Sequence, residues 1–234
     1  MDRFLSRNAV RIVSFIVIFL SFEVAFCGND TIPSAPQTAE EWFEKGRASF
    51  DNEDYAEAVE CYNKSIELSP NDALAYYNLG LAYDVGGQDY DKAIECHKRA
   101  IVLDLDFPLI YYNLGVVYLE GKQNYEKAIE CFEKAVALAK LFANAYFNLG
   151  AAYQVGRQDY DKAIECYEKV IDLDPDFAEV YFNLGTAYQE QGNEEKATKY
   201  YKEAARLGHE RFATMVTRGK YPVGRKPQIL LKNR

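Results

Sequence analysis

The sequence predicts an all-α protein built from five stacked helical hairpins, and three observations lead to this prediction. An Asn-Leu-Gly triplet recurs at a constant interval, apolar residues within each interval follow helical spacing, and a short turn divides each interval in two. The composition is that of a globular chain, since 49% of the 234 residues are hydrophobic and 27% are charged. Because one hairpin cannot bury its own apolar face, neighbouring hairpins must stack to form a continuous core.

The repeat keeps its register along most of the chain. Its Asn-Leu-Gly triplets begin 35 residues apart, at Asn78, Asn113, Asn148 and Asn183. A tyrosine five positions after each asparagine keeps the same interval, at Tyr83, Tyr118, Tyr153 and Tyr188. Going back 34 residues from Gly80 leads to Gly46, which extends the register by one unit. We therefore place five units at residues 39–72, 73–107, 108–142, 143–177 and 178–211.

Each unit contains two amphipathic segments, as the second unit illustrates. From Tyr76 to Tyr83 the apolar residues fall at i, i+3, i+4 and i+7, which predicts one face of a first helix. From Ala93 to Ala100 a similar spacing predicts a second helix. Asp89 ends the turn between them and is placed to cap the second helix.

A glycine recurs inside every predicted first helix, at Gly46, Gly80, Gly115, Gly150 and Gly185. Glycine inside a helix costs roughly 1 kcal/mol relative to alanine, so its recurrence needs a packing reason. We expect the second helix of the unit to cross there, closer than a Cβ atom would allow. Large side chains recur on that second helix at Tyr62, Phe132, Tyr167 and Tyr201, and His97 fills the same position in the second unit.

The motif formed by Trp42, Gly46, Ala58, Tyr62 and Pro70, renewed in each later unit, resembles the tetratricopeptide repeat. The resemblance covers residues 39–211, and the longer turns of three units are similar to those of Sel-one-like repeats. It implies a right-handed superhelical solenoid whose first helices line a concave groove. Because the last repeat needs a cap, residues 212–234 are expected to provide a capping extension of the last helix, followed by a basic tail.

In this family, fixed positions of each first helix form the inner surface of the groove. Position 5 holds an aromatic ring in every unit, at Phe43, Tyr77, Tyr112, Phe147 and Phe182. Positions 9 and 12 add Arg47, Leu81 and Val116, and Phe50 and Leu119. The resemblance therefore implies an aromatic and apolar surface, most pronounced in units one to three. Such a surface suits an extended or helical peptide.

The asparagines of the repeated triplet form a ladder beside these positions, at Asn78, Asn113, Asn148 and Asn183. Two interpretations stay open for them. Their amides can bind the backbone of a captured peptide, or they can tie one helix to the neighbouring repeat. The two roles can also overlap, so we include all four residues in the candidate site.

The N-terminal segment has the features of a secretory signal. Three arginines precede an 11-residue apolar run at residues 12–22, and small residues follow near Cys27. Two alternatives remain, an uncut membrane anchor and a lipid-modified Cys27. All three interpretations place the rest of the chain outside the cytoplasm, as a secreted or periplasmic protein that is either free or membrane-anchored. Residues 28–38 are small, polar and contain proline, which predicts a flexible linker.

Several classes of function are excluded or disfavoured. The net charge of -9 argues against a nucleic-acid-binding protein. With two histidines and no convergent acid, base and nucleophile, we expect no enzyme activity, no metal and no cofactor. The four repeat cysteines, spaced 35 residues apart from Cys61 to Cys166, are interpreted as small helix residues.

The sequence therefore predicts a non-catalytic scaffold that binds a protein or peptide segment in its concave aromatic groove. Its action would aid assembly of an extracytoplasmic or membrane-associated complex. An alternative is a membrane-tethered structural subunit that contacts partners through other surfaces. These would be the acidic convex face of residues 39–211, or the tail after Arg211, which holds six Lys or Arg residues and no acid.

Overall fold

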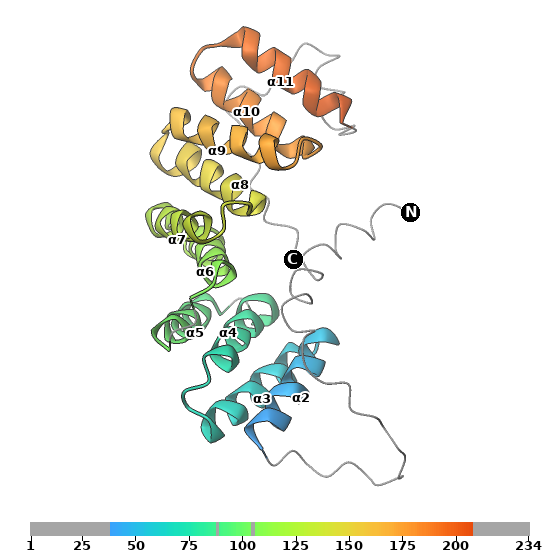
Figure 1. Cartoon of the computed structure of the whole chain (residues 1–234), viewed down its shortest axis with the longest axis vertical. Helices are drawn as coiled ribbons and strands as arrows, with labels where there is room; N and C mark the ends of the chain where they lie inside the picture. The colour runs from blue at the N-terminus through green and yellow to red at the C-terminus, as the bar shows by residue number, and fades with distance from the viewer. Residues whose placement is uncertain (1–37, 88, 104–105, 208–234) are drawn as a thin grey trace.

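A computed structural model describes residues 38–87, 89–103 and 106–207. In these residues ten α-helices form five hairpins, and there is no strand. The hairpins are α2 (Ala39–Asp51) with α3 (Tyr55–Leu68), α4 (Ala73–Ala82) with α5 (Tyr90–Val102), α6 (Pro108–Glu120) with α7 (Tyr125–Leu138), α8 (Ala143–Ala152) with α9 (Tyr160–Leu173), and α10 (Ala178–Glu190) with α11 (Glu194–Arg206). They stack in chain order along a curve, which confirms the predicted solenoid (Figure 1).

The second helix of every unit begins at a side-chain cap. Asp89 accepts a hydrogen bond from the backbone N–H of Lys92 at 3.3 Å, as its position in the sequence predicted. Equivalent caps form in the other units at Asp54, Asn124, Asp159 and Asn193. Such a cap contributes about 1 kcal/mol, so the sequence marks the start of each second helix strongly.

The longer turns are accommodated in two different ways. In units two and four the first helix widens into a π-helical turn, η1 (Tyr83–Gly87) and η2 (Tyr153–Arg157). In unit three the α-helix continues to Glu120 instead. A π-helical turn takes up an extra residue without breaking the helix.

The recurring glycine lies directly under the large side chain of the second helix. A methyl group at Gly115 would lie 2.7 Å from Cε1 of Phe132, a distance that real Cβ atoms do not show. In the other four units the corresponding distances are 2.9 Å to Tyr62, 2.7 Å to His97, 2.7 Å to Tyr167 and 2.8 Å to Tyr201. The structure therefore confirms that the second helix crosses each of these glycines more closely than a Cβ atom would allow.

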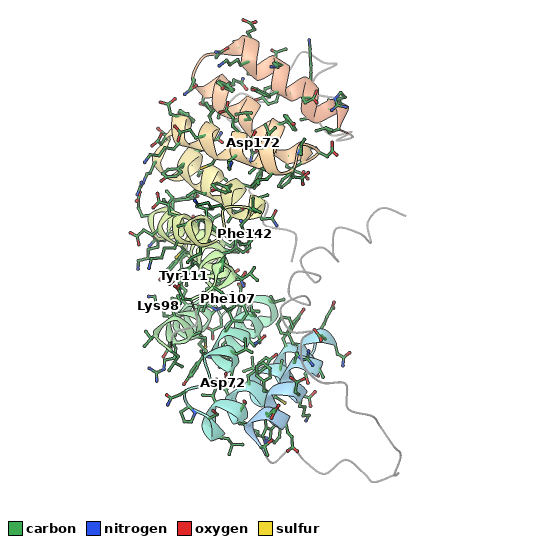
Figure 2. All side chains as sticks on the ribbon, in the orientation of Figure 1. Asp72, Lys98, Phe107, Tyr111, Phe142 and Asp172 are labelled. Carbon is green, nitrogen blue, oxygen red and sulfur yellow. The ribbon has the colours of Figure 1, made fainter. Side chains whose placement is uncertain are left out.

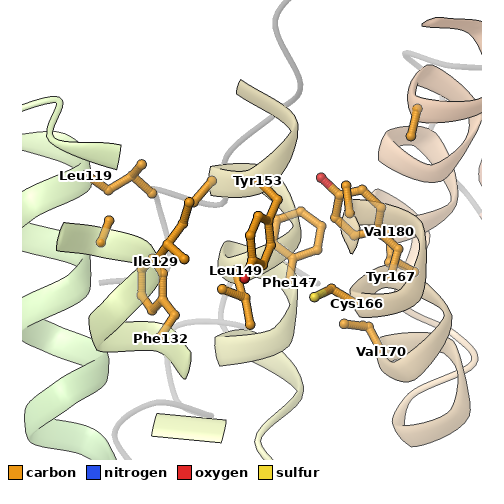
Figure 3. Close-up of a cluster of buried hydrophobic side chains, with 14 of the residues drawn as sticks. Leu119, Ile129, Phe132, Phe147, Leu149, Tyr153, Cys166, Tyr167, Val170 and Val180 are labelled. Carbon is orange, nitrogen blue, oxygen red and sulfur yellow. The ribbon is translucent and has the colours of Figure 1, made fainter. Parts of the chain in front are cut away.

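The apolar core runs between the hairpins. One buried cluster extends from Ala93 in unit two to Ala204 in unit five. Its middle contains Phe132, Phe147 and Tyr167, which follow one another across successive helices in Figure 3. Each helix packs mainly against its neighbours in the chain, as expected for a solenoid.

The remaining sequence-based expectations fall on other parts of the chain. The proposed signal or anchor (1–27), the linker except Thr38, and the cap extension and basic tail (212–234) lie outside the described residues. Within the described ranges, we find no helix long and apolar enough to cross a membrane.

Replacing Gly115 with alanine should destabilise the array. The new methyl group would overlap the fully buried Phe132 ring, and overpacking of this kind costs about 1–3 kcal/mol. Gly87→Ala is the control, because no atom lies within 4 Å of that site. Thermal unfolding followed by circular dichroism should show a lower Tm for Gly115→Ala alone. Equal Tm values for the two variants would contradict the close approach of the helices.

The stability of unit two should depend on pH through His97. The ring is fully buried, neither of its nitrogens has a hydrogen-bond partner, and burial lowers its pKa from 6.5 to about 4. The unfolded chain therefore binds a proton between about pH 6.5 and 4, whereas the folded chain does not. Stability is fully present above pH 6.5 and falls by about 3 kcal/mol as the pH approaches 4.

His97→Phe is the matched variant, since Phe132 fills the same position in unit three. The difference in unfolding free energy between wild type and His97→Phe, measured by urea titration from pH 7 to pH 4, isolates the histidine from the carboxylates. As the pH falls, the unfolding free energy of His97→Phe should rise relative to that of the wild type. A difference that does not vary with pH would show that His97 does not titrate in this way.

Candidate functional site

All of the candidate residues lie on the first helices of the five hairpins. In Figure 1, α4, α6 and α8 follow the inner side of the curve, and α5 and α7 follow the outer side. Because a given position recurs once per unit, residues at equivalent positions form rows along the inner side. The structure thus distributes the candidate residues over five successive first helices.

The candidate residues differ in exposure along the array. Half-buried side chains are found in units one to three, at Phe43, Arg47, Phe50, Asn78, Leu81, Tyr112 and Asn113. The others are buried, at Tyr77, Val116, Leu119, Phe147, Asn148, Phe182 and Asn183. The accessible part of the row therefore lies in the first three units, and most of it belongs to units one and two.

The aromatic residues at position 5 are packed between other rings. Tyr77 lies 5.7 Å from the ring of His97 and 5.1 Å from that of Phe107, measured between centroids. Tyr112 packs in the same way on Phe132 and Phe142. Such pairs contribute about 0.5–1.5 kcal/mol beyond the area that they bury. These rings therefore help to hold each first helix against the second helix of its unit and against the residue that precedes the next first helix.

The sequence analysis did not identify the phenylalanines that pack on the position-5 rings. Phe107, Phe142 and Phe177 stand immediately before the first helices of units three, four and five, and each packs on the position-5 ring of the preceding unit. Figure 2 shows Phe107 and Phe142 at successive junctions. Their constant spacing of 35 residues was the signal that could have revealed them.

The asparagine ladder divides into two groups. Asn113 donates from Nδ2 to the hydroxyl of Tyr77 at 2.9 Å, and Asn148 donates to that of Tyr112 at 3.3 Å. Both bonds connect neighbouring units, in agreement with the tying interpretation. Asn78 instead donates to the backbone carbonyl of Leu74 in its own helix, at 2.9 Å.

Asn183 follows a variation of the same arrangement. The position-5 residue of the preceding unit is Phe147, which offers no hydroxyl. Asn183 pairs with the hydroxyl of Tyr167, whose pKa is raised by burial although this hydrogen bond acts in the opposite direction. Tyr167 also donates to Oε1 of Gln154 at 2.9 Å. The polar groups at this buried position thus satisfy one another.

The accessible part of the surface offers apolar contact, amides and one paired charge. Arg47 bonds to Glu44 of the same helix, with Nε 3.0 Å from the carboxylate. An exposed pair of this kind contributes little to stability, so the guanidinium remains able to exchange partners. No group of three or more potential metal ligands occurs among the residues described.

The repeat cysteines lie away from this surface, on the second helices. Cys61, Cys96, Cys131 and Cys166 are all buried and unpaired. Burial raises the pKa of Cys96, Cys131 and Cys166 to about 12, so these thiols stay protonated at neutral pH. They behave as small packing residues, as the sequence suggested.

Comparison with family models gives matches along most of the chain. Residues 46–84, 87–120, 122–156 and 155–192 match the family described as TPR repeat. Residues 178–209 match a tetratricopeptide repeat. Residues 20–48 match a Sel1 repeat, a segment that begins within the proposed signal and includes the linker.

Individual proteins resemble shorter or longer parts of the chain. The human small glutamine-rich tetratricopeptide repeat-containing protein beta is 39% identical over 67 residues, which are 26% of this chain and 22% of that protein. A crystal structure of MamA is 31% identical with a TM-score of 0.68, covering 74% of this chain and 93% of MamA.

A second solved structure shows the fold alone. YrrB, described as a TPR protein with an unusual peptide-binding site, is 23% identical with a TM-score of 0.69, covering 77% of this chain and 92% of YrrB. Together with the matched repeats and the observed hairpins, these comparisons establish the family to which the chain belongs. The chain belongs to the tetratricopeptide repeat family and has Sel1-like character.

Proposed function

We propose that this chain is a non-catalytic scaffold that captures a protein or peptide segment on its concave face, within units one to three. The observation that carries the proposal is the half-buried apolar surface formed by Phe43, Phe50, Leu81 and Tyr112. Membership of a family of protein-interaction repeats supports it. Aromatic and aliphatic side chains of this kind supply contact area with little loss of rotamer freedom.

The bound segment is expected to present apolar side chains. The accessible row is extended along several units and is mostly uncharged, so a strand-like or helical segment can contact it over its length. The later units contribute less, because the rings of Phe147 and Phe182 are buried. This gradient in accessibility assigns recognition to the N-terminal half of the array and a mainly structural role to the other half.

We further propose that the protein acts outside the cytoplasm, in the assembly of an extracytoplasmic or membrane-associated complex. This part rests on residues 1–27, which lie outside the described residues, and on their resemblance to a secretory signal. Intact mass measurement of the protein isolated from its source should show a chain that begins at Gly28. A chain with its N-terminal segment retained, or one carrying a lipid mass on Cys27, would favour one of the two anchored alternatives. A chain that retains this segment in the cytosolic fraction would refute the proposed location.

Leu81→Glu should weaken binding of a peptide selected against the full chain from a random displayed library. The half-buried Leu81 lies in the accessible row, and a carboxylate there would place an unpaired charge against the apolar ligand. We expect the Kd to rise by roughly tenfold or more, since about 1.4 kcal/mol of lost contact already gives this factor. Fluorescence anisotropy with the labelled peptide measures the change.

Val102→Glu is the control, because Val102 is 73% exposed at the end of the second helix of unit two. It introduces the same charge without touching the concave face, so the Kd should stay within about twofold. If both variants weaken binding equally, or if neither weakens it, the peptide does not bind at the proposed concave surface. Deleting residues 218–234 separates the alternative, since loss of binding only on deletion would assign recognition to the basic tail.

A further inference from the structure

The exposed apolar side chains of the array lie along one edge. At each crossing, the chain passes from the last turn of a second helix to the first turn of the next first helix. The hairpins stack in one orientation, since neighbouring turns are joined by pairs such as Lys122 with Asp91. The crossings therefore form one edge, the inter-unit edge, and Figure 2 shows four of its residues in succession, Asp172, Phe142, Phe107 and Asp72. Among the described residues, the large apolar side chains that are exposed all lie on this edge, at Leu68, Leu74, Val102, Leu138 and Leu141.

The two most exposed of these side chains depart from the repeat. Leu141 is 82% exposed, and Val102 is 73% exposed. Polar residues hold the position of Leu141 at the other crossings, at Asn71, Asp106 and Asp176. Acidic residues hold the position of Val102 in units one and four, at Glu67 and Asp172. The fold thus accepts polar side chains at both positions. Exposed apolar residues that share one face of a protein mark an interaction site.

The inter-unit edge changes in charge from one crossing to the next. The crossing between units four and five is acidic, with exposed Asp172, Asp174 and Asp176. Only a weak pair of 3.9 Å joins Asp172 to Lys169. The crossing between units three and four contains Leu138 and Leu141 and no acid. The crossing between units two and three contains both Val102 and the exposed Asp106. From unit five towards unit two, the edge is therefore first acidic, then apolar, then mixed.

Residues 208–234 lie outside the described residues, and their sequence has the complementary order. They follow α11, whose last residue, Arg206, ends on the inter-unit edge as the other second helices do. Basic residues come first, at Arg218, Lys220, Arg225 and Lys226. An apolar run comes next, at Ile229, Leu230 and Leu231. Lys232 and Arg234 follow, and there is no acid after Glu210. A segment that left unit five along this edge would meet opposite charges first and apolar side chains next.

The segment is long enough to take this course. Packed helices lie about 8–10 Å apart, so the four helices of two units span at most about 40 Å. An extended chain covers about 3.3 Å per residue, so the 22 residues from 208 to 229 can reach about 70 Å. The apolar run can therefore reach Leu141 without full extension of the residues before it.

We propose that residues 218–234 dock along the inter-unit edge of their own chain, as a strap across units five to three. The bases from Arg218 to Lys226 pair with the aspartates between units four and five. The apolar run from Ile229 to Leu231 covers Leu138 and Leu141. The strap shields the exposed apolar residues of the edge and joins units that are not consecutive. It uses none of the candidate groove residues, so this inference does not rest on the proposed function.

Zero-length cross-linking of the full chain with a carbodiimide tests the contact, because this reagent joins a lysine to a carboxylate only where the two meet. Peptide mass analysis should find Lys220 or Lys226 joined to Asp172, Asp174 or Asp176. A mixture of ¹⁵N-labelled and unlabelled chains identifies the source of the carboxylate, and each cross-linked peptide should contain a single isotope. Peptides of mixed isotope would assign the contact to a second copy and overturn docking within one chain. The absence of these cross-links, or their spread over acids of the whole array, would overturn the proposal as well.

Two variants test the apolar half of the contact. Leu141→Asn introduces the residue that unit one holds at this position, and a triple change of Ile229, Leu230 and Leu231 to serine alters the strap alone. Because salt screens the ion pairs, each variant should lower the NaCl concentration that halves the cross-link yield by roughly twofold or more. Combining the two variants should lower it no further.

Leu68→Asn is the matched control. Leu68 is 55% exposed on the same edge, but it belongs to unit one, beyond the proposed contact. This variant should leave the halving concentration unchanged. If Leu141→Asn and the serine variant have no effect, or if Leu68→Asn has an equal one, the apolar run does not dock at Leu138 and Leu141 and the proposal fails.

Discussion

Each hairpin depends on the close approach of its two helices at one glycine. The first helix offers no side chain at that point, and the second helix places a large ring there, as Phe132 does over Gly115. This contact sets the distance between the helices and hence the width of each unit. Because the units are stacked, a change in one hairpin alters the surface offered to the next.

The aromatic row to which we assign recognition also serves packing. Tyr77 and Tyr112 lie on the inner side of the solenoid, yet each is held between two rings and accepts a hydrogen bond from the next unit. Rings that are engaged in this way have less surface left for a ligand. The row changes character along the chain, because its half-buried residues all belong to units one to three and its residues in units four and five are buried.

The sequence was sufficient for the fold because its signals are local or strictly periodic. The 35-residue register, the glycines and caps such as Asp89 each fix a feature of the hairpin, and the structure contains all of them. The exposure of the site residues was not predictable in the same way. Asn113 bonds to the hydroxyl of Tyr77 in the preceding unit, Asn78 bonds within its own helix, and Asn183 pairs with Tyr167, although all three occupy the same position of the repeat. The ring of Phe107 was missed because it stands at the last position of unit two, immediately before α6 and outside the motif.

The measurement that tests the helix contact most directly is a double-mutant cycle between Gly115 and Phe132. The free energies of unfolding of Gly115→Ala, Phe132→Leu and the double variant are compared with that of the wild type. If the methyl group and the ring compete for one space, alanine should cost much less once the ring is shortened, with a coupling of about 1–2 kcal/mol. Additive effects, equal within about 0.5 kcal/mol, would contradict the contact on which the hairpins depend.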